Sequence, residues 1–185
     1  MFAVNSTRIP GCYELISTIR EDARGKFVKT YHKEFFASHG LAMDFREEYY
    51  TVSNKGVLRG LHFQMPPMAH AKLVYCTQGF VLDAVLDLRL GSPTYGEHQL
   101  FELSVERANQ IYIPVGLAHG FYVPDTQATM VYNVTSIYSE VHDVGIRWNS
   151  AGIPWPDYAP FVSARDAALP PLSEFRSPFN YSPSP

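Results

Sequence analysis

The sequence predicts an all-β fold, a β-sandwich or barrel of the jelly-roll type with a few short helices. Short segments rich in β-branched and aromatic residues recur along the chain, and Gly, Pro, Asn and Asp separate them at intervals of about eight to twelve residues. Many short strands at this spacing are typical of two packed sheets or a closed barrel. The segments that carry the pattern are 25–31, 71–76, 80–88, 98–105, 110–115 and 128–135.

The composition agrees with one folded domain over residues 1–185. A chain of 185 residues buries roughly 70% of the surface that its unfolded form exposes. Apolar residues make up 46% of the chain and charged residues only 18%, which argues against a disordered protein. A short helix is predicted over 32–39, before a glycine, and the proline-rich region after Ser150 is expected to wrap the sheets with a helix fragment or two.

Charge and apolar pattern argue against several partners. The net charge of −3 gives no reason to expect nucleic acid or an anionic membrane surface as a partner. No apolar run approaches the roughly 18–20 residues that a membrane-spanning helix needs. The first ten residues lack the basic and apolar regions of a secretory signal, and Cys12 and Cys76 are expected to be reduced, structural thiols. A cytoplasmic location is therefore expected.

The segment V-L-R-G-L-H-F-Q places an arginine and a histidine on a strand. In a regular strand Arg59 shares a face with Leu61 and Phe63, and His62 lies on the other face, so only a twist or bulge near Gly60 brings the two together. Taken alone, a histidine in this position is more often a hydrogen-bonded, partly buried residue than a catalytic base.

Other polar side chains also stand in apolar surroundings. Asp83 and Asp87 lie within V-L-D-A-V-L-D-L, where a buried carboxylate needs a partner. His119 is flanked by small residues at what the sequence suggests is the end of a strand, where a turn lets a ligand approach. Tyr132, in T-M-V-Y-N-V-T, is either a core tyrosine or a phenol that faces a ligand site.

The residue pattern favours a pocket without a metal ion. A histidine-based metal site in a small β-barrel is expected to show an H-x-H pair with a nearby carboxylate, but His62 is followed by Phe-Gln and His70 lies alone in a proline-flanked loop. No G-x-S-x-G motif or glycine-rich phosphate loop is present. What remains is a histidine base, a tyrosine acid, and Arg and Lys for anions. Such a set suits proton removal and return at a carbon next to a carbonyl.

Six stretches of the chain are informative when taken together: G-V-L-R-G-L-H-F-Q, A-K-L-V-Y-C-T-Q-G, L-D-L-R-L-G-S-P-T-Y-G, Y-I-P-V-G-L-A-H-G-F, G-I-R-W-N and S-A-R-D. In sequence and in order, from Arg24 to about Asp166, the chain resembles the dTDP-4-dehydrorhamnose 3,5-epimerase family of nucleotide-sugar epimerases. The resemblance implies a single epimerase domain with a cupin-type jelly roll. It also implies a nucleotide-diphosphate sugar as substrate, no cofactor or metal, and a homodimer.

The resemblance also implies roles for individual residues. His62 matches the general base, and Asp166 matches the carboxylate that orients it. Lys72 matches the lysine that binds the substrate near its ketone oxygen and stabilises the enolate. Tyr132 matches the acid that returns a proton from the opposite face of the sugar ring.

The remaining matches concern substrate binding. Positions that match ligand-binding side chains of the family are Arg24, Arg59, His119, Asp143 and Arg165. Family members exchange their N-terminal segments in the dimer, so Arg24 is expected to serve the neighbouring subunit's site. The stretch R-E-E-Y-Y departs from the family pattern at the nucleotide end, where Glu47 and Tyr49 are the candidates for reading or stacking on a base.

Two alternatives stay open. One is an enzyme that epimerises only C3 or only C5, on a dTDP sugar or on a different nucleotide sugar such as a CDP- or GDP-linked one. The other is a non-catalytic or metal-using barrel that shares only the fold.

Overall fold

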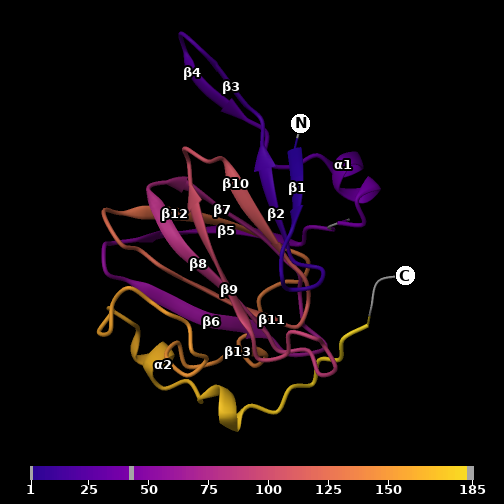
Figure 1. Cartoon of the computed structure of the whole chain (residues 1–185), viewed down its shortest axis with the longest axis vertical. Coiled ribbons are helices and arrows are strands. Elements are labelled where there is room, and N and C mark those ends of the chain that lie inside the picture. Colours follow the sequence, from indigo (N-terminus) through magenta and orange to yellow (C-terminus); the bar gives the residue numbers. More distant parts are fainter. Residues whose placement is uncertain (1, 42–43, 183–185) are drawn as a thin grey trace.

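Two antiparallel sheets packed face to face form the body of the computed structural model, which describes residues 2–41 and 44–182 (Figure 1). The six-stranded sheet has the order β1 (Phe2–Ser6), β2 (Tyr13–Ser17), β10 (Asn109–Ile113), β7 (Lys72–Gln78), β12 (Ala128–Val134) and β5 (Glu47–Ser53). The five-stranded sheet has the order β13 (Asp143–Gly145), β6 (Leu58–Gln64), β11 (Leu117–Tyr122), β8 (Phe80–Asp87) and β9 (His98–Ser104). This is the predicted cupin-type jelly roll.

The rest of the chain adds a hairpin and three short helical segments. Strands β3 (Ile19–Asp22) and β4 (Gly25–Val28) form a hairpin that projects away from both sheets (Figure 1). The helical segments are α1 (Lys33–Ser38), α2 (Ala164–Ala167) and the 3₁₀ helix η1 (Leu172–Glu174). None of the helices in the described ranges is both long and apolar enough to cross a bilayer.

The apolar core lies between the two sheets. Val74, Ile111 and Met130 from the six-stranded sheet meet Val85 and Leu103 from the five-stranded sheet, and all five are fully buried. Burying each such side chain contributes roughly 1.5–3 kcal/mol, so this layer is what holds the sheets together.

The outer faces of the sheets are covered differently. The chain after Ser150 packs Trp155 and Phe179 against Leu61 and Phe63 on the outside of the five-stranded sheet. This confirms that the proline-rich region wraps a sheet, with α2 and η1 as its helical fragments (Figure 1). Phe36 from α1 covers only part of the outside of the six-stranded sheet.

A bulge in β6 decides what faces the interior. His62 is paired with His119 and Arg59 with Phe121, so Gly60 and Leu61 oppose Gly120 alone. The two backbones approach closely here: a Cβ on Gly60, whose φ is +123°, would lie 2.6 Å from the Cα of Gly120. The prediction from a regular strand, that Arg59 and His62 lie on opposite faces, is therefore wrong. The alternative, a bulge near Gly60, is confirmed.

The other strand predictions are confirmed with shifted ends, and some strands were not predicted. The segment 25–31 is strand only over Gly25–Val28, and 110–115 is strand over Asn109–Ile113. The strands β1, β2, β3, β5 and β13 were missed. The expectation that His119 lies at a strand end is wrong, because His119 is buried in the middle of β11, next to the bulge.

Candidate active site

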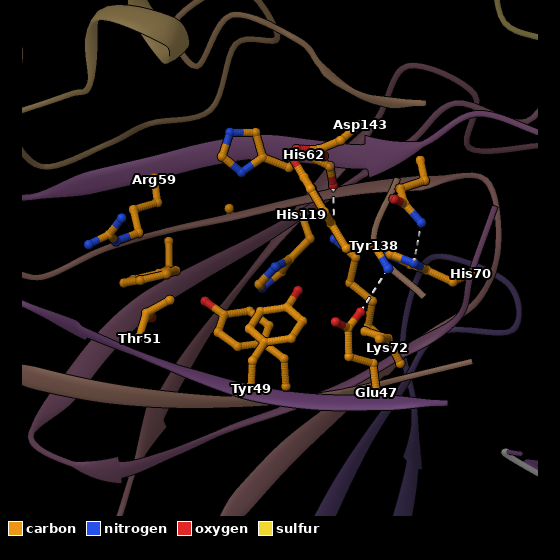
Figure 2. A pocket seen from close by; sticks show the side chains of 15 residues that line it. Glu47, Tyr49, Thr51, Arg59, His62, His70, Lys72, His119, Tyr138 and Asp143 are labelled. Carbon is orange, nitrogen blue, oxygen red and sulfur yellow. Dashed lines mark hydrogen bonds between the residues drawn. The ribbon is translucent and has the colours of Figure 1, made fainter. Parts of the chain in front are cut away.

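A pocket of about 400 Å³ opens between the two sheets (Figure 2). Its walls come from β5, β6, β7, β11, β12 and β13, together with the loops that carry His70 and Tyr138. The lining residues are Glu47, Tyr49, Thr51, Arg59, His62, Gln64, His70, Lys72, His119, Gly120, Phe121, Tyr132, Val134, Tyr138 and Asp143. Most of the side chains that the sequence selects therefore lie around one cavity.

His62 is held from behind by Asp166. The Nε2 atom of His62 lies 2.7 Å from Oδ1 of Asp166, and the backbone N–H of Gly60 donates to Oδ2 at 3.1 Å. Burial alone would raise the pKa of Asp166, but the contacts with His62 and Gly60 and the charge of Arg165 outweigh it and lower that pKa. An ionised Asp166 only accepts hydrogen bonds, so Nε2 of His62 carries the proton and Nδ1 is left as the free basic nitrogen.

Helix α2 fixes the position of Asp166. Ser163 is its N-cap, and the backbone N–H of Asp166 donates to the Ser163 hydroxyl at 3.0 Å. Asp166 does not itself line the pocket; it lies buried between α2 and β6. The bulge and the cap thus place His62 on the pocket wall and its carboxylate partner behind that wall.

His119 forms a second histidine–aspartate pair, which is sealed from solvent. Its Nε2 lies 2.7 Å from Oδ2 of Asp83, with side-chain exposures of 3% and 0%. Burial raises the pKa of Asp83, and the contacts with His119 and the charge of Lys72 oppose that rise without cancelling it. The partner that the buried Asp83 was expected to need is His119. Asp87 likewise has partners, in Arg89, Ser92 and Thr94.

Lys72 brings a cation to the floor of the pocket. It is 5% exposed, and its Nζ donates to the backbone carbonyl oxygen of His62 at 3.1 Å. Burial lowers the pKa of Lys72 from 10.5 to about 8, against the opposing charges of Asp143 and Asp83. The ammonium form is therefore the main one at neutral pH.

Tyr132 faces the pocket from the sheet opposite His62. It is 5% exposed, and its ring stacks on Tyr49 with centroids 4.8 Å apart and planes inclined by 14°. Burial raises the pKa of Tyr132, with Thr51 acting in the other direction, so its phenol stays protonated. Burial also raises the pKa of Tyr49 to about 12. One face of the Tyr49 ring is thus occupied by Tyr132.

The remaining predicted residues lie toward the mouth. Arg59 is exposed and its Nε donates to the Ser53 hydroxyl at 2.8 Å. Asp143 lines the pocket, and Arg165 pairs with it at 2.7 Å without lining the pocket itself. Glu47 accepts the backbone N–H of Tyr138 at 2.8 Å.

Arg24 is the one predicted site residue that lies outside this region. It sits in the turn of the β3–β4 hairpin with a side-chain exposure of 89%, and pairs with Asp22 at 2.6 Å. It does not line the pocket of its own chain. Its expected role in a neighbouring subunit stays a prediction.

Sequence reasoning missed several lining residues. Thr51 had a usable signal, since it follows Glu47 and Tyr49 at the period of two that puts side chains on one strand face. Gln64 shares the interior face of β6 with His62 by the same rule. Tyr138 lies in a loop without periodicity and had no signal. His70 was considered only as a metal ligand; across residues 2–41 and 44–182 no group of three or more His, Cys, Asp or Glu is arranged to hold a metal ion.

Comparison with known proteins finds the same family by sequence and by structure. The family model for dTDP-4-dehydrorhamnose 3,5-epimerase matches residues 6–174. The dTDP-4-dehydrorhamnose 3,5-epimerase of Salmonella typhimurium is 39% identical over 178 residues, which cover 94% of this chain and 97% of that protein. The crystal structure of dTDP-6-deoxy-D-glucose-3,5-epimerase from Legionella pneumophila in complex with dTDP-4-keto-L-rhamnose matches with a TM-score of 0.93 and 32% identity, over 98% of this chain and 100% of that chain.

A third relative carries a narrower name. The dTDP-4-dehydrorhamnose 3-epimerase of Streptomyces niveus is 35% identical over 171 residues, 91% of this chain and 83% of that protein. Proteins named for one and for two epimerisations thus resemble this chain to a similar extent.

Proposed function

The chain belongs to the dTDP-4-dehydrorhamnose 3,5-epimerase family, and we propose that it inverts C3, C5 or both carbons of a nucleotide-linked 4-keto-6-deoxyhexose. It is an isomerase that acts on a nucleotide sugar. The observation that carries the proposed mechanism is the position of His62 on β6 and Tyr132 on β12, since these strands belong to opposite sheets and both side chains line one pocket. A sugar ring between them meets a base on one face and an acid on the other.

His62 removes the proton. Asp166 holds the ring through Nε2, so the free Nδ1 takes the proton from the carbon next to the ketone, and Asp166 stabilises the imidazolium that forms. The electron pair of the broken C–H bond moves into a new carbon–carbon double bond, and the ketone oxygen becomes an enolate oxygen. Lys72, the buried ammonium on the pocket floor, stabilises the negative charge of that oxygen.

Tyr132 returns a proton from the other side. The electron pair of the enolate re-forms the ketone, and the carbon takes the phenolic proton on the face opposite to His62, which inverts its configuration. Proton exchange with solvent then returns imidazolium and phenolate to their starting forms. Because burial raises the pKa of Tyr132, the phenol is protonated and ready to donate when the enolate forms.

We further propose that the enzyme is a homodimer in which the β3–β4 hairpin serves the partner's site. Two features support this. Arg24 is exposed in that hairpin, outside the pocket of its own chain, and Phe27 beside it is 59% exposed. The outer face of β5 also presents Tyr50 at 69% and Val52 at 46% exposure, which is an apolar surface suited to a second copy.

Mixed dimers test this assembly. Arg24→Ala and His62→Ala subunits, each inactive or weak alone, are unfolded together, refolded and assayed. If Arg24 serves the partner, one site of each mixed dimer has both an intact His62 and an Arg24 from its neighbour, and activity returns. If Arg24 acts in its own subunit, neither site is complete and the mixture stays inactive.

Turnover measurements decide the substrate and the number of epimerised carbons. The enzyme is incubated with dTDP-, CDP-, GDP- and UDP-linked 4-keto-6-deoxyhexoses, and the products are identified by NMR. We expect inversion at C3, C5 or both with one nucleotide strongly preferred. Inversion at C3 alone would assign the chain to the activity named for the Streptomyces niveus relative. No inversion with any of the four would contradict the proposed function.

A metal-using barrel is the alternative from another class, and chelation separates it. We expect full activity after exhaustive treatment with a chelator and no stoichiometric zinc, iron or manganese by elemental analysis. Activity that falls on chelation and returns with one added metal would overturn the proposed mechanism.

We also propose that residues 1–185 act as one domain and that the enzyme is cytoplasmic. The free, buried thiols of Cys12 and Cys76 support the cytoplasmic location.

A further inference from the structure

His70 is a pocket residue that the mechanism above does not use. It lies in the loop between β6 and β7 and lines the pocket close to Glu47, Lys72 and Tyr138, at the end opposite Arg59 (Figure 2). Its Nε2 atom is buried and has no hydrogen-bond partner in the described part of the chain. A buried polar nitrogen without a partner in a ligand pocket needs a physical explanation.

The hydrogen bonds of Gln64 determine which nitrogen of His70 carries the hydrogen. The Oε1 atom of Gln64 accepts the backbone N–H of Ser139 at 2.6 Å, and Nε2 donates to the carbonyl oxygens of Met68 at 2.9 Å and Ile137 at 3.1 Å. The amide orientation is thereby fixed. The same Nε2 lies 3.1 Å from Nδ1 of His70. The NH₂ group has two hydrogens for these three acceptors and cannot itself accept, so a hydrogen on Nδ1 would point at a donor; the hydrogen of His70 is therefore on Nε2.

The surroundings keep this imidazole uncharged. Burial, together with the charge of Lys72, lowers the pKa of His70 to about 3. His70 therefore presents a neutral N–H donor beside the Lys72 ammonium, without adding a second positive charge to this end of the pocket. A neutral donor suits an oxygen that bears no full charge, such as a hydroxyl, a ketone or a base carbonyl.

We infer that His70 donates its Nε2–H to an uncharged oxygen of the bound nucleotide sugar and thereby contributes to substrate specificity. The inference rests on the proposed function, since it needs a nucleotide sugar in this pocket. The acceptor belongs either to the hexose or to the nucleoside, and the two sources give different binding results.

Two substitutions test the hydrogen bonds of the two ring nitrogens of His70 one at a time. In His70→Asn the side-chain oxygen takes the place of Nδ1 and still accepts from Gln64, but the side chain is too short to reach the position of Nε2. In His70→Gln the amide reaches that position and supplies a neutral donor. A role in substrate binding predicts that Asn weakens binding and Gln restores it. A purely structural role through Gln64 predicts the opposite order.

The experiment is calorimetry with dTDP and with a dTDP-linked 4-keto-6-deoxyhexose, plus KM and kcat for parent, His70→Asn and His70→Gln. We expect His70→Asn to weaken sugar binding and raise KM roughly tenfold, the cost of one neutral hydrogen bond in a buried site, while His70→Gln stays within about threefold of the parent. Weaker binding of dTDP as well assigns the acceptor to the nucleoside, and unchanged dTDP binding assigns it to the hexose. Equal affinities and KM values for all three proteins would overturn the inference. An inactive parent protein would instead refute the proposed function.

Discussion

His62–Asp166 and His119–Asp83 are two histidine–aspartate pairs on or against the five-stranded sheet, each with a nitrogen–oxygen distance of 2.7 Å. His62 and His119 are even direct partners in the pairing of β6 with β11. Their surroundings differ. The side chain of His62 is 26% exposed and that of His119 only 3%.

The two carboxylates also differ, both in their hydrogen bonds and in the direction in which their pKa is shifted. Both oxygens of Asp166 have partners, one in His62 and one in the backbone N–H of Gly60, and its pKa is lowered. Asp83 has one oxygen on His119 and one without a hydrogen-bond partner among the described residues, and its pKa is raised by burial. The pair distance alone thus does not define a general base. We propose His62 as the base because it is the more exposed histidine and because its carboxylate partner has both oxygens hydrogen-bonded.

The largest expected effect comes from removing His62, compared with a substitution of His119. His62→Ala should lower the epimerisation rate by about 10²–10⁴-fold or more and should abolish exchange of the C3 and C5 hydrogens with deuterated solvent. His119→Asn should slow turnover but leave exchange detectable, since the base is intact. NMR of the sugar recovered from D₂O measures both, with circular dichroism as the control for folding. Exchange that survives in the His62 variant and disappears in the His119 variant would reverse the assignment.

A smaller effect is expected at the mouth of the pocket. Arg59 gives an overall acidic protein a local positive charge, and removing one charge-assisted contact costs about 1.5–3 kcal/mol. Arg59→Ala should therefore weaken binding of a nucleoside diphosphate by roughly tenfold to a hundredfold. Arg8, which is exposed and does not line the pocket, provides a matched control as Arg8→Ala. Unchanged affinity of the Arg59 variant in calorimetry would mean that the diphosphate binds elsewhere.

The smallest expected effect concerns pH. Lys72 loses its proton as pH rises through about 8, so kcat should fall above pH 8 as enolate stabilisation is lost. Tyr49, with a pKa of about 12, does not titrate in that range. Lys72→Arg, which stays charged, should remove this decline whatever its absolute rate. A decline at the same pH in the arginine variant would show that another group titrates there.

The same titration has a consequence for stability. Between pH 8 and 10.5 the unfolded chain holds more protons at Lys72 than the folded chain, so the contribution of Lys72 to the free energy of unfolding rises with pH in this window. The buried thiols of Cys12 and Cys76, whose pKa values are raised by burial, contribute in the opposite direction above pH 9. Burial of the ammonium therefore destabilises the protein at pH 7, by on the order of 3 kcal/mol. In urea denaturation, the difference in the free energy of unfolding between Lys72→Met and the parent should therefore shrink from pH 7 to pH 10.

The strands that the sequence revealed are those with one apolar face in the core. In β7 and β12, Val74 and Met130 point inward at a period of two, and that alternation was visible. Strand β5 was missed because neither of its faces is apolar throughout: Glu47, Tyr49 and Thr51 line the pocket, while Glu48, Tyr50 and Val52 are exposed. A strand that serves a site on one side and solvent on the other has no hydrophobic period to detect.

The residues that meet around the pocket were largely predictable from the sequence, but their arrangement was not. The family resemblance selected His62, Lys72, Tyr132 and Asp166, and three of them line one pocket with the fourth directly behind His62. The close approach of Gly60 to Gly120, which turns Arg59 and His62 to the same side, joins residues 60 positions apart and leaves no local pattern. The unpaired nitrogen of His70 likewise depends on Gln64, Met68 and Ile137 meeting in the folded chain.

The central claim is that base and acid act from opposite walls of the pocket, and Tyr132→Phe tests it most directly. This change removes only the phenolic hydroxyl and keeps the ring that stacks on Tyr49. His62 should still remove a proton and return it to the same face. In D₂O the recovered sugar should then carry deuterium with its configuration retained, while inverted product forms about 10²–10⁴-fold more slowly than with the parent enzyme. Epimerisation at the parent rate would show that Tyr132 is not the acid. Loss of both hydrogen exchange and inversion would show that the base and the acid do not act separately.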